Sequence, residues 1–204
     1  MPDVRDHIFI GVAVISLLAF LFAISDTTTF KDITVSDTIT AEAITVETLN
    51  NLVPHIIVSS SEDQLILSTN KTQKINYTDL EDNNKMWYNS SGNIFVNESG
   101  EYLITISAIV KSGLANKYIE IWIRHNEVPV NRSNTRIQIP NANTEMILAV
   151  TYILDMDKGD NFALMMWGDS TTNQLQATAA ATTPVRPASP SIIVSANKIG
   201  AVND

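Results

Sequence analysis

The acidic run at residues 155–160 is the segment of the chain that could most readily bind a metal ion. Asp155, Asp157 and Asp160 place carboxylates close together, as calcium loops do. A calcium loop also needs further oxygen ligands and a terminal glutamate at a fixed spacing, which this segment lacks. The pattern therefore favours a solvated turn through Lys158-Gly159-Asp160 over a metal site.

The residue types of the chain give little support for a catalytic site. The chain has no cysteine, which excludes a thiol nucleophile and a cysteine-ligated zinc, and its three histidines, His7, His55 and His125, are scattered. His125 ends a predicted strand, but a serine hydrolase also needs a nucleophile motif such as G-x-S-x-G, which is absent. We predict that the protein is not an enzyme and uses no cofactor.

The net charge of the chain indicates which classes of partner it can bind. The chain has 13 Lys and Arg against 22 Asp and Glu, a net charge of −9. Nucleic-acid binding relies on clustered Lys and Arg, so no nucleic-acid partner is predicted.

Residues 100–124 are the most regular part of the chain and predict a β-hairpin. Every second residue from Tyr102 to Val110 is apolar, and Ile119, Ile121 and Ile123 alternate with polar or aromatic residues. The intervening residues 111–116 include the Gly, Ser and Asn expected of a turn.

Residues 54–204 continue this pattern and predict an all-β head. Turn clusters separate many short strands, with no helical segments between them, which is typical of a sandwich or jelly roll. The predicted strands are 55–59, 64–68, 74–77, 94–96, 101–110, 118–125, 145–154, 161–167, 174–179 and 191–198.

Residues 7–25, after a short tail at 1–6, are almost wholly apolar and predict a transmembrane helix. The alternative is a signal peptide cleaved after Ala23-Ile24-Ser25, although the preceding segment lacks the usual positive charge. The anchor residues would include Ile8, Phe9, Leu17, Leu18, Phe20 and Phe22.

Residues 26–53 predict a short β-shaft. An Ile-Thr-Val or Ile-Thr-Ala triplet recurs at Ile33, Ile39 and Ile44, and β-branched residues dominate. One such repeat cannot bury its own apolar residues, so we expect it to wind around copies of itself, most simply three. An extended linker and a short trimeric coil at 41–52 are the alternatives.

Several short motifs in residues 74–199 carry a family resemblance. In order they are residues 91–96, the G-x-Y strand start at Gly100-Glu101-Tyr102, and residues 121–127, 152–160, 164–167 and 187–194. This arrangement resembles the globular-head jelly roll shared by complement subcomponent q and the tumour necrosis factor superfamily. It is most similar to the version in phage and marine-virus fibre and capsid-associated proteins.

Three turns in these motifs have a physical reason. Gly100 would let the chain turn tightly into a core strand, and Gly159-Asp160 would form a hairpin before the strand that ends at Trp167. Asn126-Glu127 departs from the Asn-Gly of many relatives, but Asn tolerates a left-handed backbone.

The resemblance implies a homotrimer whose apolar faces pack about a threefold axis. We therefore expect a viral structural protein on the virion surface: a membrane-anchored trimeric spike or fibre, or a capsid-associated protein. Its head would contact a host-surface glycan or protein, or other virion proteins. The alternative is a cell-surface adhesin or extracellular filament subunit of a bacterium or archaeon.

Aromatic residues and polar loops supply the candidate site residues. Loops 111–117, 131–143 and 168–173, with a polar loop at Trp87-Tyr88, would carry the partner contacts. The contact candidates are Trp87, Tyr88, Asn116, Asn134, Asp169 and Asn173. The candidates for the core or the trimer interface are Tyr102, Ile104, Ile121, Trp122 and Trp167.

Overall fold

The computed structural model describes residues 53–201, which form strands and turns and contain no helix. The predicted anchor with its six named residues, and the predicted shaft up to residue 52, lie outside the described residues. No helix within residues 53–201 is long and apolar enough to cross a membrane.

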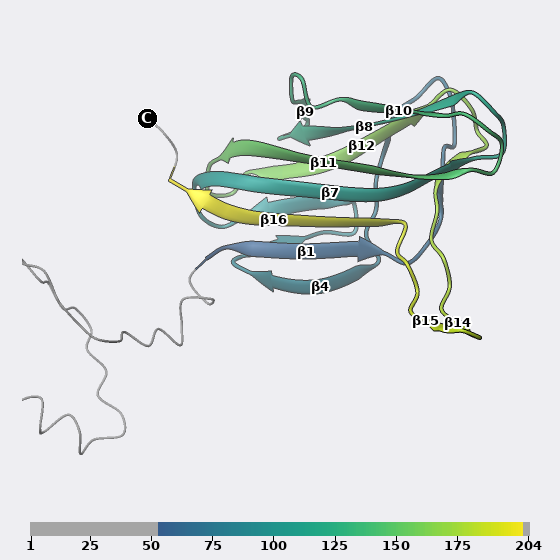
Figure 1. The fold of residues 1–204 in the computed structure, drawn as a ribbon. Coiled ribbons are helices and arrows are strands. Elements are labelled where there is room, and N and C mark those ends of the chain that lie inside the picture. Colours follow the sequence, from purple (N-terminus) through teal and green to yellow (C-terminus); the bar gives the residue numbers. More distant parts are fainter. Residues whose placement is uncertain (1–52, 202–204) are drawn as a thin grey trace, which may run out of the picture. The chain divides into compact units, whose positions relative to one another are not determined.

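One sheet, here called sheet A, has seven strands within the described residues (Figure 1). Its long strands lie in the antiparallel order β11, β7, β16, β1, β4. The short strands β13 and β2 extend the sheet beyond the end of β16. The bounds are β1 His55–Ser60, β2 Gln64–Leu65, β4 Asp79–Asn84, β7 Gly100–Ser112, β11 Glu145–Met156, β13 Asn173–Leu175 and β16 Ile192–Gly200.

The second sheet, sheet B, also has seven strands in the part of the chain that the structure describes. Its order is β10, β8, β12, β6, β5, with β3 added to β12 and β9 to β8. The bounds are β3 Gln73–Lys74, β5 Met86–Tyr88, β6 Asn93–Val96, β8 Lys117–His125, β9 Val128–Pro129, β10 Thr135–Ile139 and β12 Asn161–Gly168. A small hairpin of β14 (Ala181–Thr182) and β15 (Val185–Arg186) projects from the sandwich (Figure 1).

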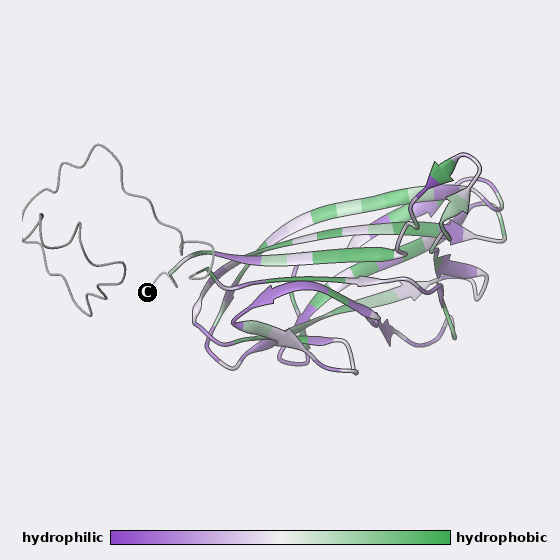
Figure 2. Cartoon of the chain, turned by 90° about the horizontal axis from the view of Figure 1, so that it is seen from below, coloured by the Kyte–Doolittle hydropathy of each residue, from purple (hydrophilic) through white to green (hydrophobic). Residues whose placement is uncertain are grey.

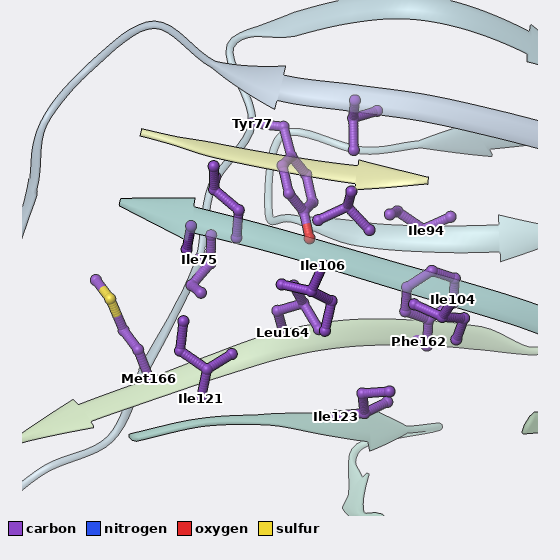
Figure 3. Close-up of a cluster of buried hydrophobic side chains, with 14 of the residues drawn as sticks. Ile75, Tyr77, Ile94, Ile104, Ile106, Ile121, Ile123, Phe162, Leu164 and Met166 are labelled. Atoms are coloured by element: carbon purple, nitrogen blue, oxygen red, sulfur yellow. The ribbon is translucent and has the colours of Figure 1, made fainter. Parts of the chain in front are cut away.

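The two sheets enclose a single apolar core. Ile104 and Ile106 of β7 face Ile121 of β8 and Phe162 and Leu164 of β12 across the interior (Figure 3). All five are fully buried. Removing such a side chain from water contributes about 1.5–3 kcal/mol, so this packing can stabilise a chain without disulfides. The predicted all-β sandwich is confirmed, and its sheets are compatible with a jelly roll.

The predicted hairpin at residues 100–124 is wrong in its pairing, although both strands exist. β7 pairs with β11, β13 and β16 in sheet A, whereas β8 pairs with β9, β10 and β12 in sheet B. The turn at Gly159-Asp160 likewise joins β11 of sheet A to β12 of sheet B and forms no hairpin. A polar turn has the same composition in both cases, so the sequence pattern does not distinguish them.

Of the three expectations for these turns, only the left-handed backbone at Asn126 holds as stated, because the turn at Gly159 forms no hairpin. Gly159 has a φ of +93° and Asn126 a φ of +46°, both in the left-handed region, and Glu127 shares it at +67°. Glycine is needed at position 100 for a different reason: a Cβ there would lie 2.6 Å from the carbonyl oxygen of Gly200. Gly100 is therefore required by the close approach of β7 to β16 and not by a tight turn.

Two buried tyrosines give a matched test of the core. The Tyr102 hydroxyl donates to the carbonyl oxygen of Glu98 (2.7 Å), and burial, with a smaller effect of the Glu98 charge, raises the pKa of Tyr102 to about 12. The Tyr77 hydroxyl has no hydrogen-bond partner among residues 53–201. We expect Tyr102→Phe to lower the free energy of unfolding by about 1–2 kcal/mol and Tyr77→Phe to raise it by about 1 kcal/mol. Urea denaturation would measure both, and equal losses in the two variants would contradict this assignment.

Candidate functional site

Asp160, the best metal-ligand candidate, joins two turns. Its Oδ2 accepts hydrogen bonds from His125 Nε2 (2.8 Å) and the Asp157 amide (2.9 Å), and its Oδ1 accepts one from Asn126 Nδ2 (2.7 Å). Within residues 53–201, no cluster of three or more acidic or histidine side chains is arranged to hold a metal ion. His125, the best catalytic candidate, is hydrogen-bonded to the same Asp160 carboxylate.

These hydrogen bonds make the head sensitive to acid. Burial raises the pKa of Asp160, but the bonds from Asn126, the Asp157 amide and His125 together outweigh it and hold that pKa below its usual value. The stabilisation is therefore complete above the unfolded pKa of about 3.9 and is lost as pH falls through the lower folded pKa.

Replacing this carboxylate should weaken the acid dependence. We expect Asp160→Asn to lower the free energy of unfolding at pH 7 by about 1–2 kcal/mol and to flatten its decline below about pH 4. Urea denaturation at pH 7 and pH 3 measures both effects. Asp157→Asn is the control, because the exposed Asp157 takes part in the turn through its backbone amide. An unchanged decline in Asp160→Asn would refute the role of this carboxylate.

The Trp87-Tyr88 pair lies in strand β5, not in a polar loop as predicted. Trp87 is 51% exposed and stacks on Phe95 with ring centres 3.9 Å apart. Tyr88 is half-buried and meets Tyr77 edge-on at 6.0 Å. Both rings therefore contribute to the packing at the β5 edge of sheet B.

The four polar contact candidates divide into two kinds. Asn116 and Asn134 are exposed. Asn173 is fully buried, and its Nδ2 donates to the Tyr118 carbonyl oxygen (2.7 Å), while Asp169 Oδ1 accepts from the Tyr118 amide (2.9 Å). Asn173 is thus unavailable to a partner and was wrongly chosen, and Asp169 is half-buried in the same turn.

The six contact candidates do not form one surface. Trp87 and Tyr88 lie at the β5 edge of sheet B, whereas Asn134 precedes β10 at the opposite edge of that sheet. Loop 131–143 also contains strand β10, so less of it is loop than predicted.

The five candidates for the core or the trimer interface lie in two places, inside the sandwich and on the outer side of sheet B. Tyr102, Ile104 and Ile121 are fully buried inside the sandwich. Trp122 and Trp167 are half-buried on the outer side of sheet B, where Trp167 Nε1 donates to the Thr69 carbonyl oxygen (2.8 Å).

The outer face of sheet A has the composition of an interface. Its side chains alternate with the buried ones along β1, β7, β11 and β16, and charged residues occur only towards the ends of β7 and β11. Ile147 is 69% exposed and Ile153 is 61% exposed. We call these residues the uncharged face: Ile57, Leu103, Thr105, Ser107, Ile109, Ile147, Ala149, Thr151, Ile153, Ile193 and Ser195.

The strand register brings these residues into contiguous rows. Thr151 lies beside Thr105, and Thr105 beside Ser195, while Ala149, Ser107 and Ile193 form the next row. At strand spacings of about 4.8 Å and about 3.3 Å per residue, the rows on β11, β7 and β16 cover a few hundred Å². The face is uncharged and partly apolar, with four Thr and Ser hydroxyls beside its Ile, Leu and Ala side chains.

Charged pairs lie around this face. Lys111 Nζ lies 3.5 Å from Glu145 Oε1 at one end, and His55 Nε2 lies 3.3 Å from Asp82 Oδ2 at the β4 side. At the other end, the two acidic residues Glu101 and Asp155 lie opposite each other on β7 and β11. Coloured by hydropathy, several long strands are green and pale over much of their length, whereas other strands and the loops carry more purple (Figure 2). An uncharged centre with charged residues around it matches the depletion of charged residues at the core of protein interfaces.

The outer face of sheet B is different in character. Glu120, Arg124 and Arg136 project from it, with Arg136 Nε 3.5 Å from Glu120 Oε1 and Arg124 paired with Glu127. The guanidinium of Arg136 lies 3.8 Å from the centre of the Tyr118 ring. The two sides of the sandwich therefore suit different partners.

Comparison with known proteins finds a likeness among solved structures. No family model and no curated protein sequence matches the chain. Among solved structures, the chain is similar to the globular domain of a zebrafish complement 1qA protein, with 11% identity and a TM-score of 0.49. The match covers 74% of this chain and 99% of that one. The sandwich described above rests on the strand pairing of this chain itself.

Proposed function

We propose that residues 53–201 are a non-catalytic binding head that assembles with copies of itself through the uncharged face. The supporting observation is the contrast between this face and the charged outer side of sheet B. Leaving Ile147 and Ile153 in water is unfavourable, and covering them with the same face of another copy removes that cost.

The position of the apolar residues favours a ring over a two-fold pair. Ile147 and Ile153 lie on β11, which pairs only with β7 in the described part of the chain and so forms an edge of sheet A. A patch displaced to one edge can meet a different part of the same face on the next copy, and such contacts form a ring where the rotation between copies closes. A ring of three agrees with the trimer expected from the sequence.

We further propose that the protein is a viral structural protein, anchored through its N-terminal apolar segment and acting as a spike, fibre or capsid-associated component. Its head would bind a host-surface molecule or a neighbouring virion protein. Three copies of a weak site on one assembly would raise the overall affinity through avidity. His125 and Asp160 are hydrogen-bonded to each other in a turn, which agrees with a binding function rather than a catalytic one.

Locating the protein tests this proposal. Gold-labelled antibodies against the head, viewed by electron microscopy, should mark the surface of purified virus particles. Labelling of the producing cell's surface or its filaments, with unlabelled particles, would instead favour an adhesin or filament subunit and refute the viral proposal.

A further inference from the structure

A groove of about 410 Å³ opens on the outer side of sheet B. Trp122 and Glu120 of β8 form one wall, and Val130, Asn131, Arg132 and Asn134 form the other. We call it the Trp122 groove. Its volume is that of a site for a small ligand, and its lining combines one aromatic ring with several polar side chains.

Trp122 differs from the other two tryptophans. Trp167 donates its indole N–H to Thr69, and Trp87 lies flat against Phe95. The indole N–H of Trp122 has no acceptor among residues 53–201, and its side chain lines the groove. A ligand can therefore use both its apolar surface and its hydrogen-bond donor.

The opposite wall is held in place by Ser133. This side chain is 1% exposed; its Oγ donates to the Val130 carbonyl oxygen (2.8 Å) and accepts from the Ile123 amide (3.0 Å). Tyr152 adds a hydrogen bond from its hydroxyl to the Ser133 carbonyl oxygen (2.6 Å). The wall is thus ordered before any ligand arrives, which lowers the entropic cost of binding.

Arg132 is held in this wall in an unfavourable backbone conformation. Its φ is +64°, a region that residues other than glycine rarely adopt, although five other non-glycine residues in the described part of the chain share it. No carboxylate among residues 53–201 forms an ion pair with Arg132, unlike Arg124 and Arg136. Its guanidinium is thus a free donor fork in a chain with a net charge of −9.

The carboxylate of Glu120, which also lines the groove, already has two partners. Asn134 Nδ2 donates to its Oε2 (2.8 Å), and Arg136 lies beside its Oε1. Repulsion of an anionic ligand by Glu120 is therefore reduced, while Arg132 attracts one. Asn131 offers a further amide for hydroxyl groups.

We propose that the Trp122 groove binds a carboxylated saccharide. The carboxylate would pair with the Arg132 guanidinium, the apolar side of the sugar ring would lie on Trp122, and its hydroxyls would bond to Asn131 and the indole N–H. An acidic peptide is less well matched, because Asp and Glu side chains offer no ring to lie on Trp122. This inference deepens the attachment role proposed above and rests on it.

The groove and the uncharged face lie on opposite sides of the sandwich, since one is on sheet B and the other on sheet A. Self-association through sheet A would leave every copy's groove open. Each assembly would therefore present several equal sites, and individual affinities of about millimolar would suffice for attachment.

Saturation-transfer NMR on the full chain in detergent tests the proposal, with 3′-sialyllactose, a glucuronic-acid disaccharide and lactose as probes. We expect binding of at least one acidic probe, and binding of lactose at least about tenfold weaker, as the loss of a charge-assisted pair implies. Trp122→Ala should abolish binding. Arg132→Gly, which suits the positive φ, should retain the fold and reduce acidic-probe affinity about tenfold. Trp87→Ala is the control and should bind normally.

Four results would overturn the proposal: no binding of either acidic probe, equal binding of lactose, normal acidic-probe binding by Arg132→Gly, or full competition by a poly-glutamate peptide. Sedimentation of the same samples separates this failure from failure of the proposed assembly. An oligomer that binds no probe would refute the groove alone, and a monomer that binds one would refute the assembly alone.

Discussion

Replacing Thr105 by glutamate is expected to convert the assembled protein into single chains. Thr105 is exposed at the middle of the uncharged face, where its hydroxyl lies 3.4 Å from that of Thr151. Assembly would bury the new carboxylate of each copy without a cation beside it, at a cost of several kcal/mol per charge. Because this cost recurs in every copy, we expect complete dissociation at micromolar concentration, measured by analytical ultracentrifugation.

Thr171→Glu is the matched control for this experiment. Thr171 is exposed in the turn between β12 and β13, and the substitution adds the same charge away from the uncharged face. It should leave the oligomer intact. If Thr105→Glu retains the wild-type sedimentation coefficient, the uncharged face is not the interface.

The second large effect concerns the core. Phe162 on β12 is fully buried between the sheets, so Phe162→Ala should lower the free energy of unfolding by about 3–5 kcal/mol, through lost burial and the cavity left behind. A loss of this size is a large part of the stability of a typical domain. Urea denaturation followed by circular dichroism measures it.

Phe95→Ala provides the comparison within the same sheet. Phe95 lies on the neighbouring strand β6, is half-buried on the outer side and stacks on Trp87. Its truncation should cost about 1 kcal/mol, the scale of one aromatic pair. Equal losses in the two variants would mean that the inner and outer sides of sheet B are assigned wrongly.

The long strands were predictable because one side of each is buried. Every second residue along the middle of β7 and β8 is apolar and buried, and the predicted and observed limits of both strands nearly coincide. Which sheet each strand joins was not predictable. The turn between β7 and β8 has the composition of a hairpin turn, and only the tertiary packing sends the chain across to the other sheet.

Two of the missed strands lie at the edges of their sheets. β4 has the sequence Asp-Leu-Glu-Asp-Asn-Asn and lies at the edge of sheet A, where charged side chains face water. β10 lies in a segment read as a polar loop, although Ile137 and Ile139 alternate with polar neighbours there and could have indicated a strand. Polar edge strands thus resemble loops in sequence.

The candidate surfaces were less predictable than the fold. Asn173 looks like a contact residue in sequence, but its amide is buried as a partner for the Tyr118 backbone. Trp122 was assigned to packing, and only its position beside Arg132 and Asn134 indicates a groove. The uncharged face is assembled from β1, β7, β11 and β16, so it emerges only once the strand order is known.

Sedimentation equilibrium of the full chain, in detergent at matched solvent density and at micromolar protein concentration, tests self-association most directly. Three 22.4 kDa chains predict a species of about 67 kDa, and Thr105→Glu predicts one of 22.4 kDa. A wild-type protein that sediments at 22.4 kDa would contradict the proposed assembly through the uncharged face.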